Sequence, residues 1–212
     1  MSRKPTFPKN PLIQIIEIGL ELWIRNQCKS IEKINLEING SALEFLSGRI
    51  SGAKLTAEAI NFKGLTFNKI ILESNSIHLN INFYNKNEKL SFKKDFKVEG
   101  TIFLDTKGIN EIISSDNWLW VGNKMAQHLL ESEKLERLDI NENILELQGT
   151  NNEAECISKG KFKIEASSGS LKIKDINNGK SFLLPMDQSI HIDYASLEND
   201  KVLIDMKSNV KP

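Results

Sequence analysis

The sequence predicts a single α+β domain built on an antiparallel sheet. Three observations lead to this fold class. One amphipathic helical segment opens the chain, strand-like segments with a period of two follow it, and two further helical segments separate these from a last series of strands. We find no low-complexity segment or interdomain linker between them. This succession is typical of an α+β domain, so we expect a mobile basic arm at residues 1–10 and one domain at residues 11–212.

The length and charge of the chain exclude some classes of protein. Its 212 residues suffice for one domain with a sizeable core. Lys+Arg and Asp+Glu both number 28, so the formal net charge is zero. Because a dedicated nucleic-acid-binding protein usually has a basic surface, we expect no nucleic-acid partner. Cys28 and Cys156 have no metal-binding or redox spacing, which favours two unpaired thiols over a disulfide.

The beginning of the chain has some features of a targeting signal. A basic segment with Arg3, Lys4 and Lys9 precedes an apolar stretch at residues 12–24. Three polar residues interrupt this stretch: Gln14, Glu17 and Glu21. They exclude a membrane span, which needs ~20 consecutive apolar residues, and no small-residue cleavage site follows. We therefore expect no signal peptide and no transmembrane helix, and a cytoplasmic protein whose contact with a membrane is peripheral, on the cytoplasmic face.

The same stretch predicts an amphipathic helix that begins at Pro11, a residue suited to helix starts. At helical spacing its polar residues fall in one narrow stripe: Gln14, Glu17, Glu21 and Arg25. The opposite side is an unusually wide apolar arc: Leu12, Ile13, Ile16, Leu20, Trp23 and Ile24, with Ile15 and Leu22 at its margin. The arc either packs onto the sheet or also touches lipid, and both can hold because the arc is wide.

Residues 45–83 predict a Gly-marked corner at residues 47–52 followed by strands at 53–60, 65–73 and 77–83. The last of these alternates cleanly between apolar and polar residues, which indicates one buried face. In the strand at 65–73 the apolar residues change phase, so we expect a bulge near Asn68 and Lys69. Before this region, residues 34–38 alternate and Asn39-Gly40 predicts a hairpin-type turn.

The second half of the chain predicts strands around two helices. A strand at 96–104 leads to a helix that Asp105 or Thr106 can cap. Trp118, Met125 and Leu129 have the spacing of a second helix of about four turns. Beyond it we expect only strands: residues 138–141, 144–149, 157–166, 170–176, 190–194 and 202–206.

Several short motifs mark the turns and strands of this chain. They are LSGRI at 46–50, GL at 64–65, LES at 72–74, IHLNIN at 77–82, VEG at 98–100, and the segments 104–115 and 197–212. In this order they resemble the LmeA-like phospholipid-binding family of bacteria, over roughly residues 34–212. Gly108 departs from the family pattern, in which an acidic or polar residue would open the helix.

The resemblance implies a fold like that of tubular lipid-binding domains. In such a fold a long curved antiparallel sheet is wrapped around the N-terminal amphipathic helix, with a second helical segment in the middle of the chain. It also implies a lipid ligand. Because the resemblance is a pattern of strands and turns, it specifies the fold better than the chemistry.

The motifs of common catalytic and metal sites are absent from the sequence, including nucleophile elbows, zinc-protease helices and phosphate loops. The three histidines, His78, His128 and His191, fall on separate predicted elements, whereas a metal site needs several converging ligands. We therefore predict no catalytic residue, no metal and no cofactor, and a protein that is not an enzyme.

Two local features suggest contact with a membrane surface. Trp118 and Trp120 lie two residues apart and cannot easily enter one core, so one of them is expected at the rim or at a membrane interface. A loop at residues 84–95 contains four lysines, which either form a solvated turn or attract anionic head groups. The predicted head-group or membrane-surface residues are Lys86, Lys89, Lys93, Lys94 and Trp120.

The sequence thus favours a non-enzymatic phospholipid-binding or lipid-handling protein that acts peripherally at a membrane. The candidate lining of an acyl-chain groove is Ile13, Ile16, Leu20, Trp23, Ile77, Leu79, Ile81, Val98, Ile102 and Trp118. The alternative is a scaffold or interaction protein with the same fold, a filled core and no lipid ligand. The sequence names neither a lipid nor a protein partner.

Overall fold

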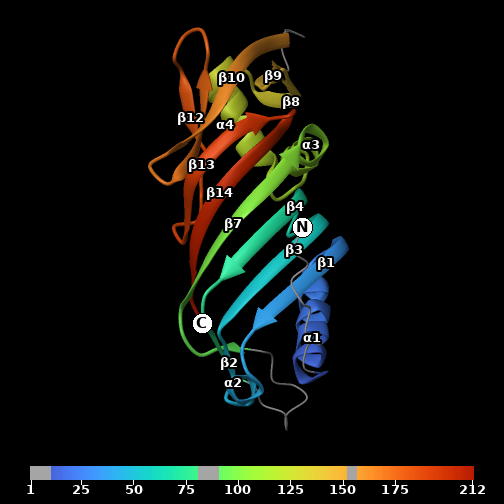
Figure 1. Ribbon diagram of the computed structural model, residues 1–212. Coiled ribbons are helices and arrows are strands. Elements are labelled where there is room, and N and C mark those ends of the chain that lie inside the picture. Colours follow the sequence, from blue (N-terminus) through green and yellow to red (C-terminus); the bar gives the residue numbers. More distant parts are fainter. Residues whose placement is uncertain (1–10, 81–90, 152–156) are drawn as a thin grey trace, which may run out of the picture.

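The computed structural model describes residues 11–80, 91–151 and 157–212. In this part of the chain the protein has an α+β fold whose largest sheet has six antiparallel strands, in the order β1-β3-β4-β7-β14-β13. These strands are β1 (Ser30–Asn39), β3 (Gly52–Phe62), β4 (Leu65–Ser74), β7 (Phe96–Asp105), β14 (Lys201–Val210) and β13 (Ile190–Glu198). They run diagonally along an elongated molecule (Figure 1). The C-terminal strand β14 thus lies in the sheet beside β7.

Two smaller sheets lie at opposite ends of the molecule. The five-stranded sheet, at the top of Figure 1, contains β12 (Ser181–Leu183), β11 (Ser170–Asp175), β10 (Ile157–Ser167), β9 (Ile144–Thr150) and β8 (Lys134–Asn141). The three-stranded sheet contains β2 (Arg49–Ile50), β5 (Ile77–Asn80) and β6 (Ser91–Phe92). We call the end with the three-stranded sheet the lower end.

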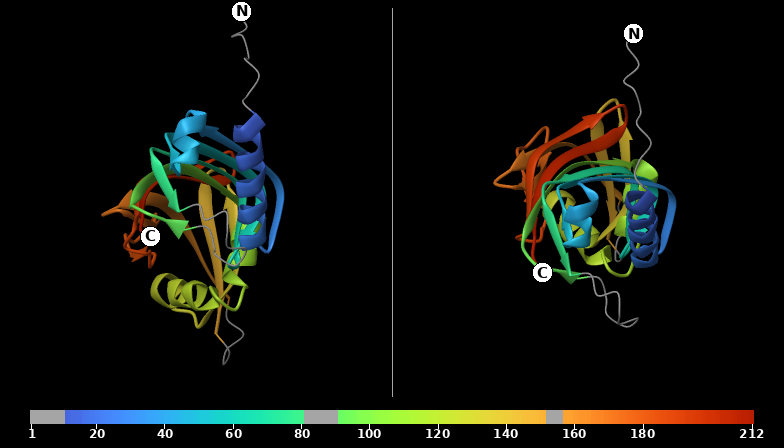
Figure 2. Two further views of the ribbon diagram at one scale, coloured as in Figure 1. Left: turned by 90° about the horizontal axis from the view of Figure 1, so that it is seen from below. Right: turned by 60° about the horizontal axis from the view of Figure 1, so that its bottom comes forward.

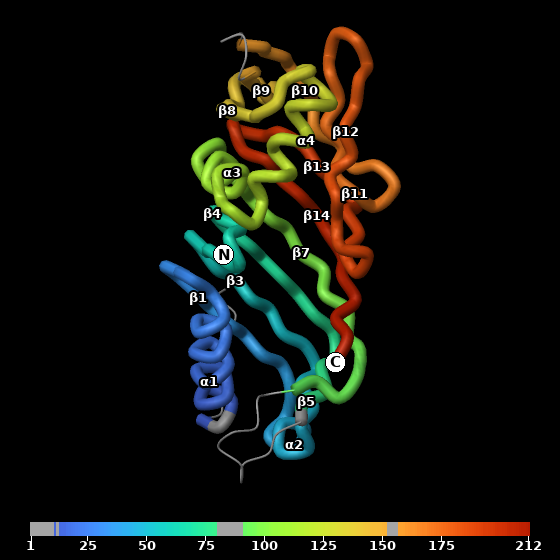
Figure 3. The backbone as a smooth tube through the Cα atoms, turned by 180° about the vertical axis from the view of Figure 1, so that it is seen from behind, coloured from blue at the N-terminus to red at the C-terminus, as the bar shows by residue number. Residues whose placement is uncertain are grey.

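The helices are divided between the same two ends. They are α1 (Pro11–Gln27), α2 (Ala42–Leu46), α3 (Thr106–Ile113) and α4 (Leu119–Leu130). From behind, α1 and α2 lie at the lower end, and α3 and α4 lie beside the five-stranded sheet (Figure 3). The views from below show the strands of the large sheet arching around α1 and α2 (Figure 2). The predicted curved sheet around an N-terminal helix is therefore confirmed, as is the second helical segment.

Apolar side chains of the five-stranded sheet, α4 and the upper part of the large sheet form one core, which we call the upper core. Strand β9 illustrates the pattern that builds it, because Leu145 and Leu147 are buried while Glu146 between them is half-buried. Phe162 is fully enclosed in the same core. The other buried members are Leu104, Met125, Ala126, Leu129, Leu135, Leu138, Ile140, Ile173, Ile192, Ala195, Val202 and Ile204.

A second cluster, the lower core, lies between the large sheet and the elements of the lower end. Its buried residues are Leu36, Ile38, Phe45, Ile50, Ile77 and Leu79. Half-buried residues of α1 pack against it, together with Phe92 and Phe96. Phe45 anchors the short helix α2 there, with 2% of its surface exposed. Within the described residues the buried apolar side chains therefore form two separate clusters, and α1 packs only against the lower one.

The polar stripe of α1 faces the open edge of the large sheet rather than solvent. Strand β1 is the first strand of that sheet. Glu17 Oε1 accepts a hydrogen bond of 2.9 Å from Ile38 N, and Glu21 Oε1 accepts one of 2.9 Å from Leu36 N. Arg25 Nη1 donates to the carbonyl of Ile31 at 3.0 Å. These side chains satisfy backbone groups that an edge strand otherwise offers to another strand.

The edge strand of the five-stranded sheet is covered in a similar way. Asn110 of α3 accepts from Leu138 N at 3.1 Å through Oδ1 and donates to Leu138 O at 2.6 Å through Nδ2. The side-chain amide thus pairs with β8 as a neighbouring strand would. The Oδ1 of Asn123 in α4 also accepts from Leu135 N at 3.4 Å. Helices therefore cover one edge of the large sheet and one edge of the five-stranded sheet.

Most of the predicted strands are confirmed, but two local predictions are wrong. Asn39-Gly40 does not form a hairpin, because the chain continues into α2 and β2 before β3 pairs with β1. The expected bulge near Asn68 and Lys69 is also absent, since Glu58 pairs with Lys69 and Ile60 with Phe67 in one unbroken register. The distortion lies instead on the facing strand, where Ala59 has a φ of 51°.

The start of α3 explains the glycine that departs from the family pattern. Asp105 caps the helix, because its Oδ1 accepts from Gly108 N at 2.7 Å. A Cβ atom on Gly108 would lie 3.1 Å from the carbonyl oxygen of Thr66. Gly108 therefore allows α3 to approach β4 closely.

Candidate functional site

Five of the predicted groove residues meet at the lower end. Ile13, Ile16 and Leu20 project from α1 and pack, half-buried, against the lower core. Ile77 and Leu79 of β5 lie within that core and are only 8% and 3% exposed. The structure thus brings together α1 and β5, which the sequence separates by about fifty residues. The half-buried residues on α1 form the accessible side of this cluster.

The remaining groove candidates lie elsewhere. Ile102 of β7 packs against the upper core. Trp118 covers the β3–β4 turn, where its Nε1 donates to the carbonyl of Lys63 at 3.3 Å. Trp23 and Val98 are half-buried, and Ile81 lies outside the described residues. Of the nine candidates that the structure describes, five thus meet at the lower end, and the groove remains a prediction.

The predicted head-group residues are also separated. Lys93 and Lys94 are exposed between β6 and β7 at the lower end, whereas Lys86 and Lys89 lie outside the described residues. Trp120 is 44% exposed on α4, beside the five-stranded sheet. Its Nε1 donates to Asn117 O at 3.1 Å, and Lys124 Nζ lies 5.1 Å from the centre of its ring. Trp120 therefore lies on a different surface from the two described lysines, Lys93 and Lys94.

The outward side of α1 and α2 is apolar, whereas the sequence pattern put only Ile15 and Leu22 at the margin of the apolar arc. Ile15, Ile18 and Leu22 are 67%, 58% and 57% exposed. On α2, Leu43 and Leu46 are 79% and 66% exposed. The spacing of Ile15, Ile18 and Leu22 is i, i+3, i+7, which puts them on one face of a helix. The sequence displays this spacing, but it does not show that Glu17 and Glu21 face β1.

The short helix α2 is held by a capping box. Glu44 N donates to Ser41 Oγ at 3.3 Å, and Ser41 N donates to Glu44 Oε2 at 2.8 Å. Glu44 Oε1 also lies 2.6 Å from Arg49 Nη2 and accepts from Ser51 Oγ at 3.0 Å. The backbone N–H of Ser41, then Arg49 and Ser51, lower the pKa of the Glu44 carboxyl from 4.5 to about 2.

We expect this capping box to make the lower end sensitive to acid. Because the pKa of Glu44 is lower in the folded protein, its stabilising contribution is complete above pH 4.5 and is lost as the pH falls toward about 2. Urea unfolding of the wild-type protein and of Glu44→Gln should differ in free energy above pH 4.5, and the difference should shrink below it. A Glu44 carboxyl that titrates by NMR near 4.5 would contradict this assignment.

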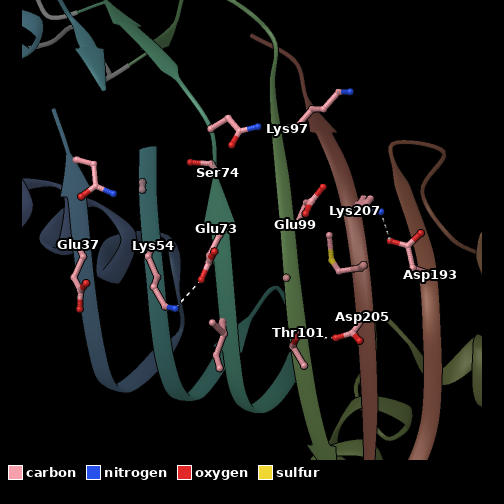
Figure 4. A pocket seen from close by; sticks show the side chains of 16 residues that line it. Glu37, Lys54, Glu73, Ser74, Lys97, Glu99, Thr101, Asp193, Asp205 and Lys207 are labelled. Carbon is pink, nitrogen blue, oxygen red and sulfur yellow. Dashed lines mark hydrogen bonds and ion pairs between the residues drawn. The ribbon is translucent and has the colours of Figure 1, made fainter. Parts of the chain in front are cut away.

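The outer face of the large sheet carries a polar cleft of about 530 Å³. Figure 4 shows its charged side chains in rows across the strands, with Lys54 paired to Glu73 at 2.6 Å and Lys207 to Asp193 at 3.1 Å. Thr101 Oγ1 donates to Asp205 Oδ1 at 2.7 Å in the same cleft. This lining suits water and polar solutes rather than an acyl chain.

Among the described residues, no cluster of three or more His, Cys, Asp or Glu side chains could hold a metal ion. In the same part of the chain, no helix is both long and apolar enough to cross a membrane. Cys28 is free, and its partial burial raises the pKa of its thiol, whereas Cys156 lies outside the described residues.

The described residues thus form a curved antiparallel sheet, an apolar cluster beneath an N-terminal helix and an exposed apolar helix face. The chain belongs to the LmeA-like phospholipid-binding family, whose model matches residues 11–200. The match includes all of the lower core and the helix that covers it. No curated protein and no solved structure matches the chain.

Proposed function

We propose that this protein binds phospholipid without chemical conversion and acts peripherally at a membrane surface. One observation carries the proposal. The half-buried apolar residues of α1 adjoin the lower core on one side of the helix, while Ile15, Ile18 and Leu22 are exposed on the other. Membership of a phospholipid-binding family supports a lipid as the ligand of this end.

The mechanism that we propose uses α1 as the movable wall of an acyl-chain site. Ile13, Ile16 and Leu20 would contact the chain in place of their present contacts with the lower core. Transfer of acyl surface out of water would supply about 25 cal/mol per Å². The exposed Lys93 and Lys94 would remain at the polar rim, close to the head group.

The burial of Ile77 and Leu79 favours a second candidate function. With 8% and 3% of their surface exposed, these residues are already satisfied by protein contacts. A protein with a filled lower core would use the same fold as a scaffold for a protein partner. The presence or absence of bound lipid decides between the two functions.

Native mass spectrometry of protein purified without detergent tests the proposal. We expect an adduct with the mass of a phospholipid. Ile16→Trp should largely abolish it, because the larger side chain fills the space between α1 and the lower core. Ile15→Trp is the matched control on the exposed side of α1 and should keep the adduct. A wild-type protein without any lipid adduct, which also fails to bind phospholipid vesicles, would instead support the scaffold function.

A further inference from the structure

The two helices of the lower end carry a group of exposed apolar side chains. In the described part of the chain, twelve large apolar side chains are exposed, and five of them lie on α1 and α2. Three form a stripe along α1, and the other two, Leu43 and Leu46, lie on α2. Monomeric proteins rarely expose contiguous apolar patches of this kind without a binding partner.

The two helices of the lower end are neighbours. They are in contact with each other, and both pack against the lower core through their inner faces. Figure 2 shows them next to each other inside the arch of the large sheet. We call the surface formed by Ile15, Ile18, Leu22, Leu43 and Leu46 the apolar end.

Three acidic groups near the apolar end make internal contacts, whereas Asp95 is exposed beside Lys94. Glu17 and Glu21 accept hydrogen bonds from the backbone of β1. Glu44 is held by Ser41, Arg49 and Ser51. Their negative charges are therefore directed into the protein rather than toward the apolar end.

Two described lysines lie at the same end of the molecule as the apolar end, and the sequence before α1 is basic. Lys93 and Lys94 are exposed at the same end of the molecule. The ten residues that precede α1 in the sequence contain Arg3, Lys4 and Lys9 and no acidic residue. An apolar helix face next to basic residues matches the chemistry of an anionic phospholipid surface, in which apolar side chains enter the acyl boundary and cations contact head groups.

From this juxtaposition we infer that the apolar end docks the protein on an anionic phospholipid bilayer. This inference rests on the proposed lipid-binding function and assigns the face that meets the membrane. In this orientation the lower core opens toward the bilayer, and the five-stranded sheet points away from it. A second copy of the chain fits this surface less well, because a symmetric dimer would bring the same basic groups together.

Vesicle co-sedimentation with two variants tests the inference. Vesicles of phosphatidylcholine alone are compared with vesicles that also contain phosphatidylglycerol. The wild-type protein should bind the anionic vesicles more tightly. The double variant Ile18→Ser/Leu22→Ser should weaken this binding by at least about tenfold, because two large aliphatic side chains no longer leave water. The matched control is Ile157→Ser/Leu183→Ser, which alters two equally exposed residues of the five-stranded sheet and should leave binding unchanged.

Charge reversal and native mass spectrometry complete the test. Lys93→Glu/Lys94→Glu should also weaken binding to anionic vesicles, and salt should weaken binding of the wild type. The Ile18→Ser/Leu22→Ser variant should retain its phospholipid adduct, so that loss of docking is distinguished from loss of the ligand site. Vesicle binding by this variant equal to that of the wild type would overturn the inference. A wild-type dimer that this variant converts to a monomer, without vesicle binding by either, would overturn it in favour of a second copy.

Discussion

Replacing Phe162 by alanine should lower the free energy of unfolding by about 3–5 kcal/mol. Phe162 of β10 has 0% of its surface exposed and lies in the middle of the upper core. Its ring is closely surrounded, because a Cβ atom on Gly160 would lie 2.6 Å from Phe162 Cζ. The truncated side chain would leave a cavity that the adjacent strands cannot fill without moving. Guanidinium unfolding followed by circular dichroism measures the effect.

Phe62→Ala is the control for the loss of a phenyl ring. Phe62 ends β3 and is 37% exposed, so its removal leaves no enclosed cavity, and we expect a loss of less than about 1.5 kcal/mol. Lipid adducts of Phe162→Ala should persist below its unfolding transition, because Phe162 has no part in the lower core. A loss for Phe162→Ala as small as that for Phe62→Ala would show that the upper core is loosely packed.

Strands such as β7 and β9 were predictable because their apolar residues alternate with polar ones in the sequence. In β7, the expected strand at 96–104 became Phe96–Asp105, and Asp105 caps the next helix as expected. Short elements were not predictable in this way. Strand β12 has three residues and α2 has five, so neither contains enough repeats to display a period. The capping box of α2 at Ser41 and Glu44 was the available signal for that helix.

The candidate site was predictable in its residue types but not in its arrangement. Alternation showed that Ile77 and Ile102 face a core, but it could not show that they face two different cores. That assignment depends on how the large sheet curves and on which elements cover each end. The orientation of α1 could not be predicted from the sequence for a related reason. A polar stripe normally faces water, and only the position of β1 as an edge strand explains why this one faces protein.

This edge contact leads to a second large effect, which we expect from the double variant Glu17→Ala/Glu21→Ala. Removal of both carboxylates leaves the N–H groups of Ile38 and Leu36 without their acceptors. The first of these bonds is buried, and each unsatisfied donor costs about 1–3 kcal/mol. Unfolding by urea should therefore show that the free energy of unfolding falls by about 2–6 kcal/mol. The loss is near the lower limit if water hydrogen-bonds to the N–H group of Leu36.

The same variant should also self-associate, because α1 would no longer hold the edge of β1 closed. An uncovered edge strand pairs readily with another strand, so size-exclusion chromatography should detect dimers or larger species. Glu17→Gln/Glu21→Gln is the matched control, since each side-chain amide retains an oxygen that can accept from the same N–H group. The control should stay monomeric and lose much less stability. If the alanine variant is as stable and as monomeric as the control, α1 is held instead by Ile13, Ile16 and Leu20, whose contacts with the lower core would then suffice.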